Sequence, residues 1–500
     1  MNDAAEPTRR TPVMTEHFDV LIVGAGISGV GGAYHLTTQC PGTSFVVLEV
    51  KETFGGTWIT HKYPGIRSDS DLHTFGYRFK PWTGVPIATA EEILTYMGEV
   101  INENDLAPHI RYHHRISSAR WSTHDNLWTV EGAHTTTGEL FRFTTNFLWM
   151  CQGYYRHEQS YTPHWDGMQT YRGRMVHPQS WPEDLDYKGK NVLVIGSGAT
   201  AATLIPAMAA ECGHITMLQR SPTFFRSGRN AIELVEQLRE LQIDETWIHE
   251  IARRRILLDQ TLFTKRTFEE PEKVRQELLD SAQAQLGPDY DIATHFTPRY
   301  RPWQQRLAFI PDGDLFQAIR SGKASVETDE IERFTETGVL LKSGRELQAD
   351  IIVTATGFNL CVLGDIDFVI DDKPLNFADT VTWRGMMFTG VPNMAWVFGY
   401  FRASWTLRAD LVADFVCRLL KRMRRTGARK VEVALRPEDK DMKLLPWIDE
   451  ENFNPGYMQR GMHLLPKRGD KAEWAHTQDY WTEKDAIPAT NLDDAAFVYS

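Results

Sequence analysis

Glycine, serine and acidic residues between positions 24 and 49 have the types and spacing of a dinucleotide-binding site. The turn Gly24-Ala25-Gly26-Ile27-Ser28-Gly29 follows an apolar run at 18–23 and precedes an alanine-containing stretch that continues to Leu36. The first glycine permits a tight turn, the second lets the backbone approach a pyrophosphate, and the third lets the helix pack close to the strand. Glu49 ends the next apolar run and can accept hydrogen bonds from a ribose diol. These residues predict a cofactor-binding βαβ unit, against the alternative of an ordinary βαβ unit without a ligand.

A second glycine-rich turn lies near the middle of the chain. The apolar strand 190–195 enters Gly196-Ser197-Gly198-Ala199-Thr200-Ala201, and the following strand, 214–218, leads into Gln219, Arg220 and Ser221 rather than an acid. At about 4 Å from a 2′-phosphate, a carboxylate costs roughly 4 kcal/mol per unit charge at an effective dielectric of about 20, and an arginine gains a similar amount. We therefore expect the first turn to bind an unphosphorylated ribose and the second to bind NADPH through Arg220. A surface salt bridge is the alternative role for Arg220.

Two further segments contain unusual groups of glycines, prolines and aromatic residues, and the first of them is too rich in special residues to be a plain linker. Gly55-Gly56-Thr57-Trp58 is followed by Tyr63-Pro64-Gly65-Ile66-Arg67-Ser68-Asp69, and Tyr171-Arg172-Gly173-Arg174-Met175-Val176-His177-Pro178-Gln179-Ser180-Trp181-Pro182 precedes the second glycine turn. Loops that are fixed by aromatic residues often line binding sites. His177 and Trp181 can also be read more simply, as residues that pack a linker between domains.

These two segments match the signatures of type I Baeyer-Villiger monooxygenases, a GGxW followed by YPGxxxD and the fingerprint [FY]xGxxxHxxxWP. With both glycine turns and an Ala355-Thr356-Gly357 strand end, the resemblance covers Phe18 to Met423. The chain is most similar to the subgroup that includes the mycobacterial activator of ethionamide-type thioamides. The resemblance implies an α/β fold with two Rossmann-like dinucleotide-binding domains, a discontinuous FAD domain and an inserted NADPH domain, plus a helical insertion.

The resemblance also implies roles for individual residues. Asp69 faces the flavin and the nicotinamide in similar enzymes and pairs with an arginine, for which Arg306 is the best match; Arg301 is the main rival, and a plain structural ion pair is the alternative. Many relatives carry a lysine just before that arginine to hold the 2′-phosphate, whereas this chain has Gln305, so Arg220 is left as the chief support for NADPH. The expected cofactor-binding residues also include Gly56, Thr57, Trp58 and Tyr63. The resemblance assigns the coupling of the two domains to Gly173, His177 and Trp181. No metal site is expected.

The activity implied by the resemblance is an NADPH- and O2-dependent oxygenation. Through a C4a-peroxyflavin, one oxygen enters beside a ketone carbonyl and gives an ester or lactone, and sulfides or thioamides are possible secondary substrates. A disulfide reductase shares the two-nucleotide architecture, but the chain lacks a CxxC pair. An N- or S-oxygenating flavin monooxygenase and an uncoupled NADPH oxidase remain as alternatives. The sequence does not identify the natural ketone or sulfide, or the oligomeric state.

The elements that must position these residues define the expected domains. We expect a flexible N-terminal tail at 1–17, an FAD-binding domain at 18–160 and 345–440, and an NADPH-binding domain at 161–230 and 296–344. Residues 231–295, dense in Glu, Leu, Arg and Gln, predict a helical insertion in which Arg253-Arg254-Arg255 is a solvated helix face. An amphipathic helix is predicted at 406–425, and the segment 441–500 is expected to wrap the surface.

Bulk composition limits the class of protein. The 500 residues carry 66 acidic and 54 basic side chains, a net charge of -12 that disfavours a nucleic-acid partner. The five cysteines are scattered and form no CxxC, which is typical of a reduced, cytoplasmic protein. No apolar run is long enough for a membrane span, so no obligatory membrane partner is expected.

Overall fold

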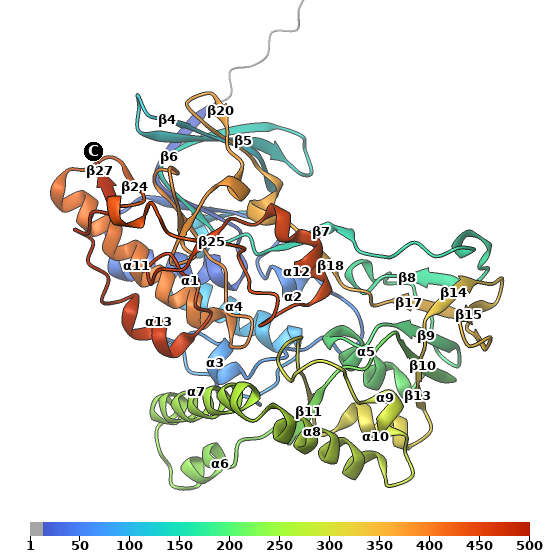
Figure 1. The fold of residues 1–500 in the computed structure, drawn as a ribbon. Coiled ribbons are helices and arrows are strands. Elements are labelled where there is room, and N and C mark those ends of the chain that lie inside the picture. Colours follow the sequence, from blue (N-terminus) through green and yellow to red (C-terminus); the bar gives the residue numbers. More distant parts are fainter. Residues whose placement is uncertain (1–13) are drawn as a thin grey trace, which may run out of the picture.

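Two sheets, each built around the strand that enters a glycine turn, organise the chain (Figure 1). The structure is a computed structural model and describes residues 14–500. The first sheet has nine strands, in the order β20 (Lys373–Pro374), β19 (Asp367–Ile370), β4 (His114–Ser122), β5 (Leu127–His134), β6 (Leu140–Met150), β1 (Thr15–Val23), β2 (Phe45–Leu48) and β3 (Ile110–Arg111), with β23 (Met394–Trp396) also paired to β6. The tail predicted at 1–17 is therefore too long, because β1 begins at Thr15; residues 1–13 lie outside the described part.

The last four residues of the central strand β1, residues 20–23, are buried on both faces, as their continuous apolar sequence requires. Val20 and Ile22 pack on one face with three helices, and Leu21 and Val23 pack on the other with tryptophans of the sheet and the C-terminal segment. The helices are α1 (Ile27–Gln39), α4 (Ala90–Glu103) and α11 (Trp405–Thr426). The amphipathic helix predicted at 406–425 is thus present as α11, and its apolar side lies in the core.

The second sheet is parallel throughout and surrounds the second glycine turn. Its order is β13 (Ala324–Thr328), β10 (His214–Gln219), β9 (Asn191–Ile195), β17 (Ile351–Thr354) and β8 (Arg174–Val176). Helices α5 (Ala199–Ala209) and α10 (Asp314–Arg320) pack on one face, and β14 (Ile331–Phe334), β15 (Gly338–Leu341) and β16 (Glu346–Gln348) pack on the other. The domain boundary predicted at 345 is too early, because β17 pairs inside the second sheet.

The predicted helical insertion is present and connects the two domains. It consists of α6 (Glu233–Glu240), α7 (Glu245–Glu269), α8 (Pro271–Leu286) and α9 (Ile292–His295), with α7 lying against α3 (Leu72–Phe75) of the first domain (Figure 1). Arg254 and Arg255 form exposed ion pairs within α7, as the sequence predicted. The prediction is wrong for Arg253, which is buried and donates hydrogen bonds to the carbonyls of His73, Thr74 and Gly76.

The C-terminal segment does more than wrap the surface. Trp447 and Trp474 are fully buried, and Glu483 forms a buried ion pair with Arg408 of α11. Tryptophan side chains of this size contribute large apolar area, so part of the segment belongs to the core of the first domain. Its regular elements include β25 (Leu444–Leu445) paired with β26 (Arg468–Gly469), and helices α12 (Gly456–Gly461) and α13 (Tyr480–Ala486). Its last strand, β27 (Phe497–Tyr499), pairs with β24 (Val431–Val433), which precedes the segment.

A two-stranded antiparallel ribbon carries the chain between the two sheets. Its strands are β7 (Tyr155–Ser160), which leaves the first sheet, and β18 (Phe358–Leu360), which returns to it. The remaining short elements are α2 (Thr57–Thr60), the parallel pair β11 (Phe225–Gly228) and β12 (Ala308–Pro311), and the pair β21 (Thr382–Trp383) and β22 (Met387–Phe388). Within residues 14–500, none of the helices has both the length and the apolar character needed to span a bilayer.

Candidate active site

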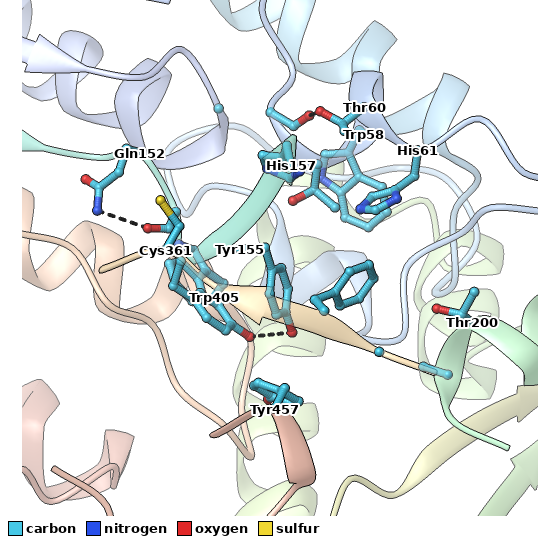
Figure 2. Close-up of a pocket in the computed structure, with 18 of the residues that line it drawn as sticks. Trp58, Thr60, His61, Gln152, Tyr155, His157, Thr200, Cys361, Trp405 and Tyr457 are labelled. Carbon is cyan, nitrogen blue, oxygen red and sulfur yellow. Dashed lines mark hydrogen bonds between the residues drawn. The ribbon is translucent and has the colours of Figure 1, made fainter. Parts of the chain in front are cut away.

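A cavity of about 930 Å³ lies where the two glycine turns face each other. Its walls also include the ribbon between the sheets and the start of α12, so both domains and the C-terminal segment contribute to it (Figure 2). Of the residues predicted from the sequence, the cavity is lined by Gly24, Gly26, Ile27, Ser28, Glu49, Gly56, Thr57, Trp58, Tyr63, Asp69, Gly196, Ser197, Gly198, Ala199, Thr200, Arg220, Ser221 and Arg306.

The first glycine turn has the geometry that its sequence predicts. Gly24 has a φ of +97°, which favours glycine, and a Cβ on Gly29 would lie 1.8 Å from the Gly24 carbonyl oxygen. Gly29 is therefore needed for packing and lies behind the cavity wall. Among residues 14–500, the nearest heavy atom to a Cβ on Gly26 would be Gly56 Cα, at 3.6 Å. Gly26 caps α1 without a side-chain hydrogen bond, so the N-terminal N–H groups of the helix are available to a phosphate.

Glu49 closes β2 and holds the first turn in place. Its Oε2 accepts a hydrogen bond of 2.7 Å from the Ala25 N–H, and its Oε1 accepts one of 2.9 Å from the Lys51 N–H. Burial raises the pKa of Glu49, and these backbone hydrogen bonds oppose that rise. A carboxylate has about four acceptor positions, so two remain for a ribose diol.

The second glycine turn repeats this arrangement. Gly196 has a φ of +130°, and a Cβ there would lie 2.3 Å from the Ala355 carbonyl oxygen. A Cβ on Gly198, by contrast, has no heavy atom within 4 Å among residues 14–500, and Gly198 caps α5 without a side-chain hydrogen bond. Arg220 lies in the cavity wall just after β10 and is exposed. No carboxylate of the described chain lies within ion-pair distance of Arg220, which disfavours the surface salt bridge considered from the sequence.

The segment 63–69 joins the two domains beside the cavity. Tyr63 is buried in the core of the second domain, where burial raises its pKa to about 12. A Cβ on Gly65 would lie 2.5 Å from Ala207 Cβ on α5, so this turn packs directly on that helix. Arg67 forms a two-pronged ion pair with Asp314 at the start of α10. These contacts fix the segment, and they hold Asp69 in the cavity wall between the two domains.

Asp69 and Arg306 form an ion pair on the cavity wall. Their side chains are 35% and 34% exposed, and Arg306 Nη1 also donates to the Phe401 carbonyl oxygen at 3.3 Å. Burial is the largest single influence and lowers the pKa of Arg306, but Asp69 together with Tyr457, Tyr154 and Tyr155 raises it by more, so the pKa lies above its ordinary value and the side chain stays cationic. The rival Arg301 donates to the Thr267 carbonyl oxygen and lies 4.0 Å from the Phe268 ring centroid, outside the cavity wall.

The fingerprint residues lie outside the cavity wall, in the second domain. A Cβ on Gly173 would collide with the Tyr171 hydroxyl at 2.2 Å. His177 is buried, accepts a hydrogen bond from the Gln179 N–H at Nδ1, and has a pKa that burial lowers. Trp181 packs against the core of the second domain. These contacts agree with the packing role considered from the sequence, and none of the three residues lines the cavity.

Several cavity residues could not be found by sequence reasoning. Tyr154 and Tyr155 follow β6, and the Tyr154 hydroxyl donates to the Tyr155 hydroxyl at 2.8 Å. Trp405 Nε1 donates to Ser28 Oγ at 2.7 Å, which ties the start of α11 to the first glycine turn. The other unpredicted wall residues include His61, His157, Phe358, Tyr457 and Arg460. Two signals were available, the ends of apolar strands at Gly153-Tyr154 and at Gly357-Phe358. The Pro455-Gly456-Tyr457 turn gave no indication of its partners.

The cavity has the donor and acceptor groups that two dinucleotides require. Each glycine turn presents a helix N-terminus and a glycine whose missing side chain leaves room for a phosphate, and Glu49 offers free acceptor positions. The buried Gln152 Oε1 and His61 Nδ1 have no hydrogen-bond partner in residues 14–500, although both residues line the cavity. Buried polar groups are normally paired. The residues therefore fit FAD at the first turn and a nicotinamide dinucleotide at the second.

Comparison with known proteins decides the family. Residues 22–82 match the NAD(P)-binding Rossmann-like domain, and residues 86–228 match the flavin-binding monooxygenase-like family. The FAD-containing monooxygenase EthA of Mycobacterium tuberculosis is 46% identical over 483 residues, which cover 96% of this chain and 97% of EthA. The chain belongs to the FAD-containing monooxygenases. A probable FAD-binding monooxygenase AlmA of Acinetobacter baylyi is 42% identical and covers 96% of both chains.

Solved structures confirm the fold of this FAD-containing monooxygenase. An oxidised steroid monooxygenase bound to NADP aligns with a TM-score of 0.76 at 22% identity, over 97% of this chain and 99% of that one. An ε-caprolactone-bound cyclohexanone monooxygenase aligns with a TM-score of 0.74 at 19% identity, over 97% and 100%. The predicted α/β fold with two Rossmann-like domains is confirmed, and FAD and a nicotinamide dinucleotide are its cofactors.

Proposed function

We propose that this flavin monooxygenase inserts one oxygen atom of O2 beside the carbonyl of a small-molecule ketone. The reaction consumes one ketone, one O2, one NADPH and one proton, and it yields an ester or lactone, water and NADP. When bound, FAD and NADPH supply the electrons that reduce the second oxygen atom to water. The single observation that supports this proposal best is the Arg306–Asp69 ion pair on the cavity wall between the two nucleotide turns.

Arg306 supplies a fixed positive charge to the reacting atoms. Addition of an oxygen nucleophile to a ketone places negative charge on the carbonyl oxygen, and a preorganised cation stabilises that charge more than it stabilises the neutral ketone. Asp69 holds the guanidinium in place and keeps its pKa above the ordinary value, so Arg306 carries its charge throughout the working pH range. Asp69 acts through Arg306 in this proposal.

The aromatic wall keeps water away from the reacting atoms. Tyr154 stacks on Trp405 with ring centroids 5.3 Å apart, and Tyr155 contacts Phe358 at 4.6 Å. Exclusion of water strengthens the field of Arg306 and limits the loss of reduced oxygen as hydrogen peroxide. The same enclosed site suits soft sulfur atoms, so sulfides and thioamides are the proposed secondary substrates.

We assign the choice of coenzyme to Arg220. Arg220 is exposed and comes directly after β10 in the cavity wall. The adenosine ribose of a dinucleotide bound at the second turn would lie at the end of β10, so the guanidinium favours a 2′-phosphate on that ribose. Gln305 also lines the cavity and contributes no charge there. Gly173, His177 and Trp181 are proposed to couple nucleotide binding in the second domain to the first domain through the ribbon.

A ketone panel with product analysis tests the proposal. The FAD-loaded protein is incubated with NADPH, O2 and cyclic, aliphatic or aryl ketones, and NADPH consumption is compared with ester and hydrogen peroxide formation. We expect one ester per NADPH with at least one ketone class. Stoichiometric peroxide with every ketone would instead identify an uncoupled NADPH oxidase, and products from amines or sulfides alone would identify an N- or S-oxygenating enzyme.

A further inference from the structure

We propose that Arg460, from the C-terminal segment, binds the pyrophosphate of the nicotinamide dinucleotide. This inference rests on the proposed function only in requiring that the second glycine turn holds that dinucleotide. The sequence predicts only that the segment 441–500 wraps the surface, yet α12 places Arg460 in the cavity wall. The inference assigns the segment a direct part in coenzyme binding.

Arg460 lies beside the second glycine turn rather than beside the first. In each domain, the end of the neighbouring strand abuts the glycine turn: a Cβ on Gly24 would lie 3.0 Å from the Cys151 carbonyl oxygen, and a Cβ on Gly196 would lie 2.3 Å from that of Ala355. Arg460 Nη2 lies 3.8 Å from the Cβ position of Gly357, two residues beyond Ala355, and donates to the Phe358 carbonyl oxygen at 3.1 Å. The guanidinium therefore lies next to the strand end that abuts the second turn.

Arg460 brings an uncompensated charge to this wall. Its guanidinium lies over the Tyr161 ring, 3.4 Å from the centroid, and the hydrogen bond to Phe358 uses one of five N–H donors. Within residues 14–500, Arg460 has no carboxylate within 4.0 Å, whereas Arg306 and Arg67 on the same wall are each paired with an aspartate. A guanidinium held in place by an aromatic ring, with free donors facing a cavity, is suited to bind a phosphate.

The order of the second sheet indicates which part of the dinucleotide Arg460 meets. β10, which leads to Arg220, and β17, which leads to Gly357, lie on opposite sides of β9. In a Rossmann unit the adenosine ribose lies at the end of the strand after the glycine helix, which here is β10, and the pyrophosphate lies at the helix N-terminus. Arg220 therefore lies on the β10 side of the pyrophosphate, where the 2′-phosphate lies. Arg460 lies on the opposite side of the pyrophosphate, beside the end of β17. NADP and NAD share the pyrophosphate, so Arg460 should not distinguish them.

Equilibrium binding separates the two arginines. The dissociation constants of NADP and NAD are measured by calorimetric titration of oxidised, FAD-loaded wild type, Arg460→Ala, Arg460→Lys and Arg220→Ala. Loss of a charge-assisted contact to a phosphate weakens binding by about 10- to 100-fold. We expect Arg460→Ala to weaken NADP and NAD by the same factor, Arg460→Lys to weaken both less, and Arg220→Ala to weaken NADP alone. Arg333→Ala, which removes an exposed charge outside the cavity, is the matched control and should change neither constant.

Three results would overturn the inference. An unchanged dissociation constant in Arg460→Ala would show that the residue does not meet the dinucleotide, and a loss confined to NADP would move its contact to the 2′-phosphate. A fall in the FAD content of purified Arg460→Ala would assign the residue to the first site. If wild type binds NADP and Arg460→Ala weakens both dinucleotides, but no ketone is oxygenated, the inference stands and the proposed reaction fails.

Discussion

At the scale of single residues, the paired Arg306 differs from two unpaired arginines of the same cavity wall, Arg220 and Arg460. Arg306 is paired with Asp69 and is therefore fixed in direction, whereas Arg220 and Arg460 line the cavity without a carboxylate partner in residues 14–500. A fixed charge suits the stabilisation of a developing negative charge, since it costs no reorganisation when the charge appears. Unpaired arginines suit the binding of a phosphate, which supplies the missing negative charge. The three arginines thus have different tasks in one cavity.

Replacement of Arg306 tests its task. Arg306→Ala should still be reduced by NADPH at a rate within a few-fold of wild type, because nucleotide binding uses other residues. Ester formation should fall by about 100- to 1000-fold, the usual effect of losing one preorganised donor to a developing oxyanion. Flavin absorbance follows the first step, and gas chromatography follows the second. Arg301→Ala, a neighbouring arginine outside the cavity, is the control and should keep both activities; full ester formation by Arg306→Ala would refute the assignment.

At the scale of elements, two glycines of the turn between β1 and α1 have different roles: Gly29 is needed for packing, and Gly26 for ligand binding. Gly29→Ala places a Cβ 1.8 Å from the Gly24 carbonyl oxygen, so α1 must shift and the protein should unfold at lower temperature. The Cβ of Gly26→Val meets only ordinary contacts among residues 14–500, but the valine side chain enters the space for a pyrophosphate. We expect Gly26→Val to be folded by circular dichroism and free of FAD by absorbance. A yellow, fully loaded Gly26→Val would contradict the position of the first site.

The contact between α1 and α11 should make stability depend on pH. His35 lies 3.5 Å from Asp410 and from Asp414 across this contact. Burial lowers the pKa of His35, but hydrogen bonds to the two aspartates raise it more, to about 9. Because the folded pKa lies above the unfolded value near 6.5, this contribution is fully present below about pH 6.5 and is lost as pH rises through 9; it amounts to about 3 kcal/mol.

Thermal unfolding across this range measures the contribution of His35. The midpoint of wild type should fall between pH 6.5 and 9, and the midpoint of His35→Gln should be lower at pH 6.5 and should change less over the same interval. Arg253 also faces Asp410, at 4.0 Å, and keeps its charge over this range, so it does not produce the same slope. Equal slopes for wild type and His35→Gln would show that other groups cause the dependence.

At the scale of the whole molecule, two domains and the C-terminal segment meet around one cavity, and buried charges hold them together. Arg253 connects the helical insertion to the first domain by three hydrogen bonds to backbone carbonyls at the end of α3. The segment 63–69 connects the first domain to α5 and α10. Both connections end beside the cavity, so the distance between the two glycine turns depends on them.

Removal of Arg253 should loosen the insertion. Arg253→Met removes a buried donor from three carbonyls, of which only that of Thr74 keeps another donor in residues 14–500, Thr406 Oγ1. It should destabilise the protein by about 3 kcal/mol. Arg254→Met, the adjacent arginine in an exposed pair with Glu250, should cost less than about 1 kcal/mol and is the control. Calorimetry and limited proteolysis within 231–295 measure both effects. Equal stability of the two variants would mean that the insertion is held by its apolar contacts alone.

Local patterns predicted the two nucleotide units well, and long-range contacts explain what was missed. The strands and glycine turns at 24–29 and 196–201 follow from periodicity and backbone geometry, which are properties of short segments. The pair of Asp69 and Arg306 came from the family resemblance, since no local pattern joins residues so far apart. Arg460 and the buried Arg253 depend on carbonyl groups and rings of distant elements. The early domain boundary has the same cause, because the apolar run of β17 fits either sheet.

The most direct test of the proposed oxygenation uses isotope-labelled oxygen. Wild type is loaded with FAD and supplied with NADPH and ¹⁸O2 together with a ketone that it converts, and the ester is analysed by mass spectrometry while NADPH and hydrogen peroxide are counted. We expect one ¹⁸O atom in each ester, at the position between the former carbonyl carbon and the migrated carbon, and one NADPH consumed per ester. Unlabelled ester, or NADPH consumption that yields only labelled hydrogen peroxide and unchanged ketone, would contradict oxygen insertion at the Arg306–Asp69 site.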